Sequence, residues 1–254
     1  MTIPRKIIKQ FYAATCSVGY FTVPIEEYHR KPFERVYEVI GTGFLVRKNL
    51  IMTNRHVING LRTARRDDDI PHEYLFVRFL EEIEGGFKER SYIPKQIYIS
   101  EQEDLDIGFI GFNHTVGEEL KTQPVKFTQN ILNLFPGQPV GVVGFPYGTE
   151  GLSTPYSKSE IYRYGPVLQQ GYVSAIAPYH GGLSITKILL DIRTAKGMSG
   201  SAVFLPQTGE VIGVHEGGVE WTLAYTIPVD QDALKVLLKS FDNTPQSDSS
   251  DFPL

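Results

Sequence analysis

The chain has 254 residues, of which 41% are hydrophobic and 21% charged, a composition typical of a globular protein large enough to bury a sizeable core. Its 25 lysine and arginine residues against 29 aspartate and glutamate residues give a net charge of −4. This balance argues against nucleic acid as the main partner, because phosphate binding needs a dense basic face. The single cysteine excludes an internal disulfide framework and a thiolate metal cage.

The N-terminal segment lacks the unbroken apolar stretch of a signal peptide, because Lys9 and Gln10 interrupt it. No window elsewhere approaches the roughly 18 apolar residues of a membrane-spanning helix. We therefore expect a soluble, cytoplasmic protein that does not enter a membrane. Cys16 is expected to be buried as a small hydrophobe, the common fate of a lone cysteine.

Short apolar runs broken by turn signals occupy most of the chain, at the spacing expected of a β-sandwich or β-barrel. Glu84-Gly85-Gly86, between two such runs, is typical of a hairpin turn. The clearest runs are Gly43–Val46, Tyr74–Leu80, Ile107–Phe112, Val140–Gly144 and Val203–Leu205. This pattern predicts a protein built mostly from strands.

Two apolar-rich blocks, at about 35–115 and 135–230, flank a more polar bridge near Lys121–Gln129, which predicts two β domains. Asp230–Phe241 is the one good helix, because Asp230 can cap it and its leucines and Phe241 form an apolar face. We place the domains at 1–125 and 126–241. The remaining tail, 242–254, is rich in serine and aspartate and is expected to be disordered.

Three short segments carry residue types suited to nucleophilic catalysis. They are Thr53-Asn54-Arg55-His56-Val57, Leu105-Asp106-Ile107-Gly108-Phe109-Ile110 and Lys196-Gly197-Met198-Ser199-Gly200-Ser201. In chain order they supply a histidine, an aspartate and a serine, which is the order of the chymotrypsin-type triad. A serine hydroxyl needs a base such as imidazole to take its proton, and a buried carboxylate can orient that ring and stabilise its charged form.

Together with Gly41-Thr42-Gly43, Gly144-Phe145-Pro146 and Gly213-Val214-His215, these segments resemble the trypsin-like serine endopeptidases. The similarity is strongest to the disulfide-free bacterial branch that includes the HtrA-type and V8-type (glutamyl endopeptidase) enzymes. It runs from about Gly41 to the helix at Asp230. The resemblance implies an all-β, chymotrypsin-like fold of two antiparallel six-stranded β-barrels with a C-terminal helix. It also implies hydrolysis of protein or peptide substrates without a cofactor or metal.

By this resemblance Ser199 is the nucleophile, His56 the general base and Asp106 the residue that orients the histidine. The first barrel then carries His56 and Asp106, and the second carries Ser199. The backbone N–H groups of Gly197 and Ser199 would form the oxyanion hole, where the absence of a Cβ at Gly197 permits close approach.

Met198 departs from the pattern of many secreted family members, which have an aspartate before the nucleophile that pairs with a new N-terminus after zymogen cleavage. We infer that activation here does not use such an ion pair. The site is either formed constitutively or ordered by substrate through the long Pro146–Pro166 loop, which has no clear period.

Several competing assignments are weaker. Asp104 lies two residues before Asp106 and would share its face on a strand, but the apolar run after Asp106 fits the family pattern better. A Gly-x-Ser-x-Gly hydrolase motif fails because its fifth position is Ser201. The cluster Asp67-Asp68-Asp69 follows two arginines and is interpreted as a solvated turn, not a calcium site. Structural or solvated roles are expected for the other histidines, His29, His72, His114 and His180.

The substrate pocket is predicted from the residues before the nucleophile and from the strand that follows it. These positions hold Arg193, Thr194, His215, Gly217 and Gly218. Thr194 with His215 resembles the pair by which glutamyl endopeptidases bind a glutamate side chain, so cleavage after Glu, or Asp, is expected. A neutral His215 that accepts a hydrogen bond would favour Gln instead, as in the viral 3C-like relatives, and Glu216 weakens the case for an acidic side chain.

Gly217 and Gly218 suit an open strand edge against which a substrate backbone can pair. Two other functions stay open. One is an inactive peptide-binding module with the same fold, which a fluorophosphonate probe would leave unlabelled. The other is an adaptor that recruits a partner through the acidic residues 243–254, whose deletion would then abolish function without changing peptidase activity.

Overall fold

The computed structural model describes residues 2–30, 36–84, 86–102, 104–113, 119–146, 165–179, 184–219 and 222–244. Most of the predicted long loop, residues 147–164, lies outside this range, as do His114, His180 and residues 245–254 of the tail. The side chain of His29 also lies outside the described part.

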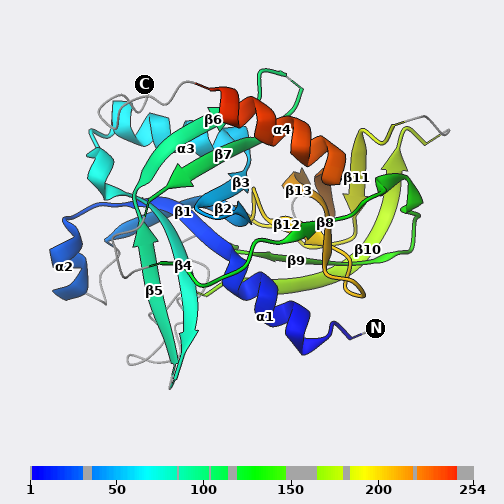
Figure 1. Cartoon of the computed structure of the whole chain (residues 1–254), viewed down its shortest axis with the longest axis horizontal. Coiled ribbons are helices and arrows are strands. Elements are labelled where there is room, and N and C mark those ends of the chain that lie inside the picture. Colours follow the sequence, from blue (N-terminus) through cyan, green and yellow to red (C-terminus); the bar gives the residue numbers. More distant parts are fainter. Residues whose placement is uncertain are drawn as a thin grey trace.

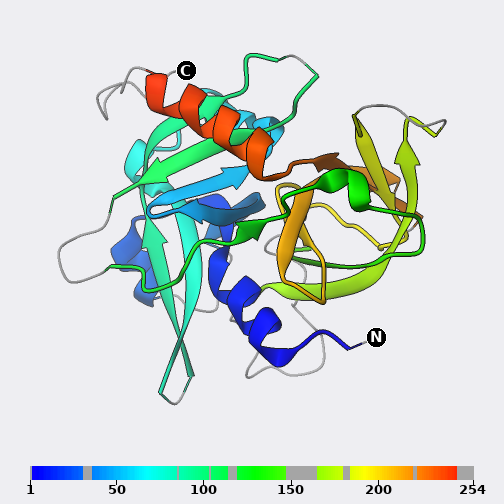
Figure 2. The same ribbon diagram turned by 45° about the vertical axis from the view of Figure 1, so that its right-hand side comes forward.

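The strands of the described residues form two seven-stranded sheets, which lie side by side in Figures 1 and 2. The first has the order β5-β4-β1-β2-β3-β7-β6, with every neighbouring pair antiparallel. Its strands are β1 (Thr15–Phe21), β2 (Tyr37–Arg47), β3 (Leu50–Thr53), β4 (Leu75–Ile83), β5 (Gly86–Tyr92), β6 (Pro94–Ile99) and β7 (Gly108–Phe112). No pairing among the described residues joins the two edges, so this sheet is a half-barrel.

The second sheet has the order β12-β9-β10-β11-β14-β13-β8, and an additional β12–β13 pairing closes six of these strands into a barrel. Its strands are β8 (Lys126–Phe127), β9 (Pro139–Gly144), β10 (Val167–Ala177), β11 (Lys187–Leu190), β12 (Ala202–Phe204), β13 (Glu210–Val219) and β14 (Leu223–Pro228). The short strand β8 pairs with β13 in parallel. The predicted chymotrypsin-like fold is confirmed, although its first sheet is a half-barrel and not a closed six-stranded one.

The predicted strands appear where the apolar runs are. All residues of β3 and β7 are buried, as expected of strands covered on both faces. Ile83 of β4 pairs with Gly86 of β5, which confirms the hairpin predicted at this point. The proposed domain boundary at 125/126 falls directly before β8, at the edge of the second sheet.

The chain has more helix than the sequence analysis predicted. The helices are α1 (Arg5–Ala14), α2 (Ile25–Arg30), α3 (Arg55–Asp67) and α4 (Gln231–Asn243), with 3₁₀ turns at His72–Tyr74 and Ile131–Asn133. The N-cap of α4 is confirmed, because the Asp230 carboxylate accepts the N–H groups of Asp232 and Ala233 at 3.1 and 2.9 Å. The expectation that α4 is the one good helix is wrong. In α3 the buried residues Val57, Ile58, Leu61 and Ala64 follow helical spacing among arginines, and the sequence analysis did not use that spacing.

Two of these helices pack against both sheets. The ring of Phe11 on α1 stacks on Phe204 of β12, with ring centroids 3.7 Å apart. On α4, Phe241 packs against Phe109 of β7 with centroids 5.9 Å apart, and Asp242 pairs with Arg47 of β2 at 2.8 Å. Figures 1 and 2 show α4 running across the first sheet after leaving the second. Both sheets are therefore packed into one body.

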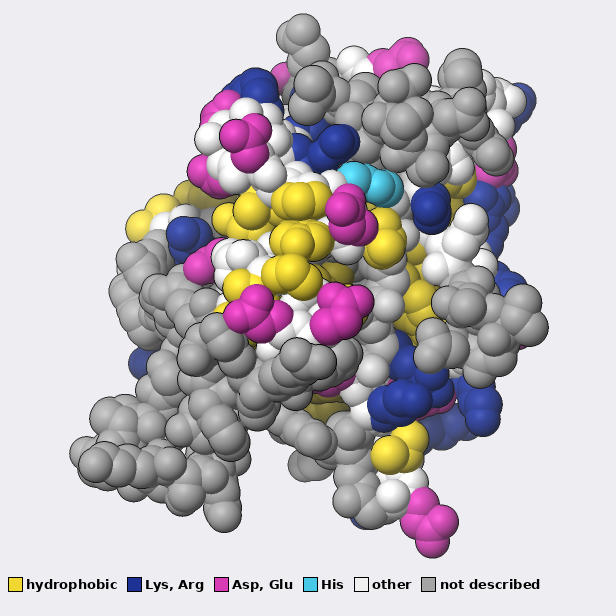
Figure 3. All heavy atoms as spheres, turned by 90° about the vertical axis from the view of Figure 1, so that its left-hand side faces the viewer, with side chains coloured by type: hydrophobic (Ala, Val, Ile, Leu, Met, Phe, Trp, Pro, Cys, Tyr) yellow, Lys and Arg dark blue, Asp and Glu magenta, His cyan; other side chains and the backbone are white. Residues whose placement is uncertain are grey.

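Exposed side chains of different kinds lie next to one another on the face toward the left of Figure 1. Figure 3 shows hydrophobic side chains there beside acidic ones, so no single kind of side chain covers this face.

Cys16 is fully buried, as expected, and burial raises the pKa of its thiol. Within the described part of the chain, no helix is long and apolar enough to cross a membrane.

Candidate active site

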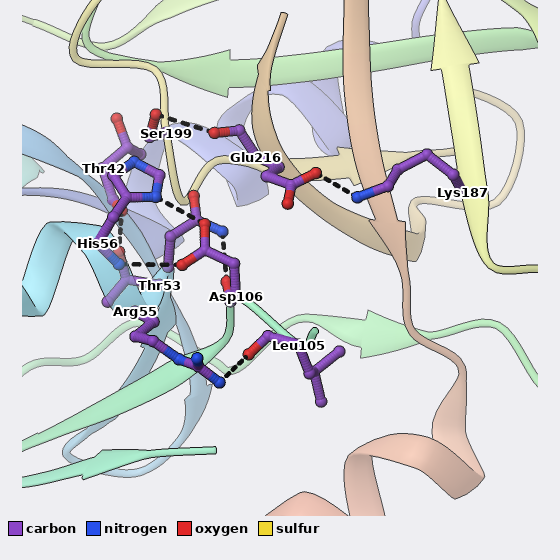
Figure 4. Close-up of polar contacts among 10 residues, drawn as sticks. Thr42, Thr53, Arg55, His56, Leu105, Asp106, Lys187, Ser199 and Glu216 are labelled. Atoms are coloured by element: carbon purple, nitrogen blue, oxygen red, sulfur yellow. Dashed lines mark hydrogen bonds and ion pairs between the residues drawn. The ribbon is translucent and has the colours of Figure 1, made fainter. Parts of the chain in front are cut away.

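His56 lies in the first turn of α3, directly after strand β3. At a helix start the first backbone N–H groups have no partner within the helix, and here the N–H of His56 donates to Oδ1 of Asp106 at 3.0 Å. The ring adds a second contact, between Nδ1 and Oδ2 of Asp106 at 2.6 Å. One carboxylate therefore contacts both the backbone and the ring of His56 (Figure 4).

Asp106 lies on the connection between β6 and β7, and its neighbours hold it there. The buried side chain of Asn54, at the start of α3, donates from Nδ2 to the Asp106 carbonyl at 2.8 Å. The Asp106 side chain is 20% exposed and that of His56 50% exposed, so the pair lies at the surface of the first sheet. Asp104, the competing acid, is exposed, and the structure does not bring it to His56.

Ser199 lies in a turn between β11 and β12 that contacts the first sheet. The backbone N–H of Thr42, on β2, donates to the Ser199 carbonyl, and the Thr42 hydroxyl donates to the Gly197 carbonyl, both at 2.8 Å. Gly200 has a φ of +90°, and a Cβ there would lie 2.0 Å from the Thr42 carbonyl oxygen. Glycine is therefore required at this position, where the two sheets meet.

The Ser199 hydroxyl donates to the carbonyl of Glu216 at 3.2 Å (Figure 4). Within the described residues it makes no hydrogen bond to His56, so it would have to turn about its χ1 angle to reach the ring. Catalytic hydrogen bonds are often absent or long before substrate binds. The backbone N–H groups of Gly197 and Ser199 have no acceptor in the described part of the chain, and Gly197 has a φ of +95°.

Met198, between these two residues, is fully buried in the core of the second sheet. Its thioether packs with the apolar residues of that core, where the secreted relatives would carry a charged aspartate. The sequence-based expectation that activation needs no ion pair at this position stays a prediction. An apolar anchor can hold the turn without any charged partner.

The predicted pocket residues differ in burial. Thr194 and His215 are buried, whereas Arg193 is exposed. A Cβ on Gly218 would lie 2.9 Å from the Thr194 hydroxyl oxygen, so that hydroxyl lies beside β13. A Cβ on Gly217 would meet nothing within 4 Å, which leaves open space over this position.

His215 is 1% exposed, and the pKa of its ring is lowered to about 4. Burial is the main cause, a backbone hydrogen bond with Tyr225 partly opposes it, and the charge of His56 lowers the pKa further. Nδ1 of the ring has no hydrogen-bond partner among the described residues. At neutral pH the ring is therefore uncharged, with one polar atom unpaired.

The low pKa of His215 predicts a loss of stability in acid. An unfolded histidine takes up a proton below about pH 6.5, whereas the folded one stays neutral down to about pH 4, so acid favours the unfolded chain. Between pH 7 and pH 4 this costs about 3 kcal/mol of unfolding free energy, from 2.5 pKa units at 1.36 kcal/mol each. Urea melts of the wild type and His215→Asn at both pH values test this. Equal losses in both proteins would contradict it.

Sequence reasoning missed two sets of contacts around the candidate site. Lys187 of β11 forms an ion pair with the carboxylate of Glu216, whose carbonyl holds the Ser199 hydroxyl. Arg55 donates hydrogen bonds to the segment that carries Asp106. The residue before His56 is visible in the motif, but nothing in the sequence indicates where its side chain lies. Among the described residues, no group of three or more acidic, histidine or cysteine side chains could bind a metal ion.

Two sheets of this topology, with a carboxylate–imidazole pair on one and a glycine-flanked serine turn on the other, define the chymotrypsin-like class of proteins. A family model described as "Trypsin-like peptidase domain" matches residues 41–214, which is more than half of the chain. The crystal structure of Deg5 is similar at a TM-score of 0.54 and 21% identity, covering 92% of this chain and 90% of that one. At this identity the Deg5 match shows the fold alone.

The chain belongs to the trypsin-like peptidase domain family, and it is a serine peptidase of the trypsin-like class. Its substrates are accordingly proteins or peptides. The match begins at Gly41 and ends at Val214, so it includes His56, Asp106 and Ser199 and stops one residue before His215.

Proposed function

We propose that the chain is an endopeptidase that cleaves through Ser199, His56 and Asp106 by way of an acyl-enzyme. The observation that carries the proposal is the 2.6 Å contact between Nδ1 of His56 and the Asp106 carboxylate on the first sheet. The Ser199 turn is hydrogen-bonded to the same sheet through Thr42. A carboxylate so close to Nδ1 favours the tautomer whose Nε2 is free to accept a proton.

The mechanism begins with rotation of the Ser199 hydroxyl from the Glu216 carbonyl toward Nε2 of His56. As Oγ attacks the scissile carbonyl carbon, its proton passes to His56, and the carbonyl electrons move onto oxygen. The N–H groups of Gly197 and Ser199, which lack acceptors in the described structure, receive that oxyanion. His56 then protonates the departing amine, and water repeats the sequence on the acyl-enzyme, while Asp106 stays ionised throughout.

A fluorophosphonate probe tests this proposal directly, because it reacts only with an activated serine. We expect labelling of the wild-type protein at one residue, which peptide mapping by mass spectrometry would identify as Ser199. A protein that binds peptide but stays unlabelled would instead be the inactive binding module. Both alternatives would bind peptide along β13, where open space lies over Gly217, so peptide binding alone does not separate them.

For specificity we propose cleavage after Glu, and more weakly after Asp. The Thr194 hydroxyl lies beside β13, where it can donate to a substrate carboxylate, and each hydrogen bond to a charged group contributes about 1.5–3 kcal/mol. Glu216 would repel such a substrate if it were unpaired. Lys187 pairs with the Glu216 carboxylate and compensates its negative charge, so Glu216 no longer argues against an acidic substrate side chain. Arg193, being exposed, can add only a screened, long-range attraction.

His215 determines whether Gln competes with Glu. A neutral imidazole has one donor and one acceptor nitrogen, and the hydrogen bond with the Tyr225 backbone occupies the donor. In that tautomer the other nitrogen accepts, which suits the amide of Gln. A carboxylate instead requires the ring to exchange tautomers and give up the Tyr225 bond, which leaves a buried carbonyl unpaired at a cost of about 1–3 kcal/mol. That cost is similar to the gain from a charged hydrogen bond, so the preference for Glu over Gln depends on the Thr194 hydroxyl.

A positional peptide library that varies the residue before the cut tests this assignment. We expect kcat/KM to be highest for Glu, about tenfold or more above an apolar residue of the same length, because a buried donor left unpaired penalises apolar side chains. Thr194→Val, which keeps the shape but removes the hydroxyl, should reduce the preference for Glu over Met. A library that favours apolar residues would overturn the roles given to Thr194 and His215.

A further inference from the structure

Arg55, the residue directly before His56, contacts the segment that carries Asp106. Its Nη2 donates to the carbonyls of Ser100 and Leu105, each at 2.9 Å, and to the carbonyl of Gln102. Figure 4 shows the guanidinium reaching away from His56 toward Leu105. The two N–H groups of this one nitrogen are therefore shared among three carbonyls that are spread over six residues of the chain.

The described residues between Ile99 and Gly108 lie in no helix or strand. The segment joins β6 to β7, and its internal backbone bonds run from Ser100 to Ile107 at 3.1 Å, from Leu105 to Gln102 at 3.0 Å and from Ile107 to Leu105 at 2.8 Å. None of these bonds fixes the segment relative to α3. The position of Asp106 against His56 therefore depends on contacts from outside the segment.

Three consecutive residues at the start of α3 supply such contacts. Asn54 donates to the Asp106 carbonyl, Arg55 to the three carbonyls before it, and His56 to the Asp106 carboxylate. Asn54 and His56 donate hydrogen bonds to Asp106 itself, whereas Arg55 donates to carbonyls of the residues that precede it. A guanidinium suits this task, because it is charged at every relevant pH and presents several N–H donors in a rigid plane.

We propose that Arg55 is a positioning residue, which holds the segment Ser100–Leu105 so that the Asp106 carboxylate meets the His56 ring. The proposal rests on the proposed function in so far as it predicts turnover. Arg55 touches no reacting atom in the mechanism above, and its side chain points away from the Ser199 turn. Its effect on catalysis passes through Asp106.

Arg55→Met tests the proposal, because methionine keeps a long side chain but removes every donor. We expect kcat to fall about ten- to a hundredfold, the size of effect that a displacement of about 1 Å produces, with KM unchanged. Arg55→Lys should restore part of kcat, since an ammonium donates to some of the same carbonyls. Arg66→Met is the matched control: Arg66 is exposed on the same helix and pairs with its neighbour Asp67 at 2.6 Å.

A second measurement does not need turnover. A proton shared between Nδ1 of His56 and the Asp106 carboxylate should give a low-field proton NMR signal, which a merely structural role of Arg55 would leave in place. We expect this signal in the wild type and in Arg66→Met, and its loss or broadening in Arg55→Met. Should Arg55→Met not fold, Arg55→Gln carries the same expectations, because its single amide is too short to reach all three carbonyls.

The outcomes separate this proposal from the proposed function. A wild type that neither cleaves peptides nor reacts with the fluorophosphonate would end the proposed function, while the low-field signal would still decide the role of Arg55. A folded Arg55 variant without donors that keeps the wild-type kcat and the low-field signal would overturn the positioning role. A rise in KM with kcat unchanged would overturn it as well, because that result assigns Arg55 to substrate binding.

Discussion

Ser199→Ala is expected to lower kcat by about 10⁶-fold, the size of effect seen when triad enzymes lose their nucleophile. The hydroxyl that attacks the substrate is removed, and the alanine methyl fits the same turn without disturbing it. The backbone donors of Gly197 and Ser199 remain, so KM should change little. Residual catalysis of about 10³-fold over water is expected from these donors and from substrate binding.

The ratio of kcat between the wild type and Ser199→Ala is measured from initial rates on the best peptide from the library. The enzyme concentration must be high enough to detect slow turnover. Ser240→Ala is the matched control, because Ser240 is remote from the site on α4 and its hydroxyl bonds its own helix backbone at 3.3 Å. Ser199→Ala should also lose fluorophosphonate labelling completely, whereas Ser240→Ala should keep it. A Ser199→Ala protein that cleaves at the wild-type rate would refute the proposed mechanism.

Much of the fold can be predicted from the sequence, because most local apolar patterns match the strand or helix that the segment forms in the structure. The buried strands β3 and β7 follow from their uninterrupted apolar runs, and α4 follows from its Asp230 cap and its apolar residues at helical spacing. The helices α1 and α3 were not predicted. In α1 only Phe11 and Ala14 are buried, whereas the four buried residues of α3 follow helical spacing that the sequence analysis did not use. A helix such as α1 depends on packing against a sheet, which a local pattern does not encode.

The choice of Asp106 over Asp104 stays a prediction, and the structure changes one of the arguments that bear on it. The two-residue period of a strand would place both acids on one face, but the structure has no strand here, and β7 begins only at Gly108. The period argument therefore does not apply to this segment. The family pattern selected Asp106, and the contacts of Asn54 and His56 supply a physical reason for it.

The contacts that surround the candidate site lie beyond sequence reasoning because they join distant parts of the chain. Lys187 meets Glu216 although β14 lies between their strands, and Thr42 meets the Ser199 turn across the junction of the two sheets. Such pairs depend on strand register and on how the sheets pack. One residue of slip in β13 would move Glu216 to the other face.

Asp106→Asn is expected to lower kcat by about 10⁴-fold, by analogy with other serine proteases that lose this charge. The amide oxygen can still accept the His56 backbone N–H, as Oδ1 does at 3.0 Å, so the segment should keep its place. The amide nitrogen, however, would donate to Nδ1 of the ring. The proton of the neutral ring would then lie on Nε2, where the ring must instead accept the Ser199 proton.

Steady-state kinetics on the same peptide test this, with Asp104→Asn as the matched control. Asp104 carries the same charge two residues away but is exposed and does not contact His56, so its loss should change kcat by less than about twofold. The low-field proton signal of the His56–Asp106 pair should vanish in Asp106→Asn and persist in Asp104→Asn. Equal losses of kcat in the two variants would mean that the nearby negative charge matters, and not the hydrogen bond that fixes the tautomer.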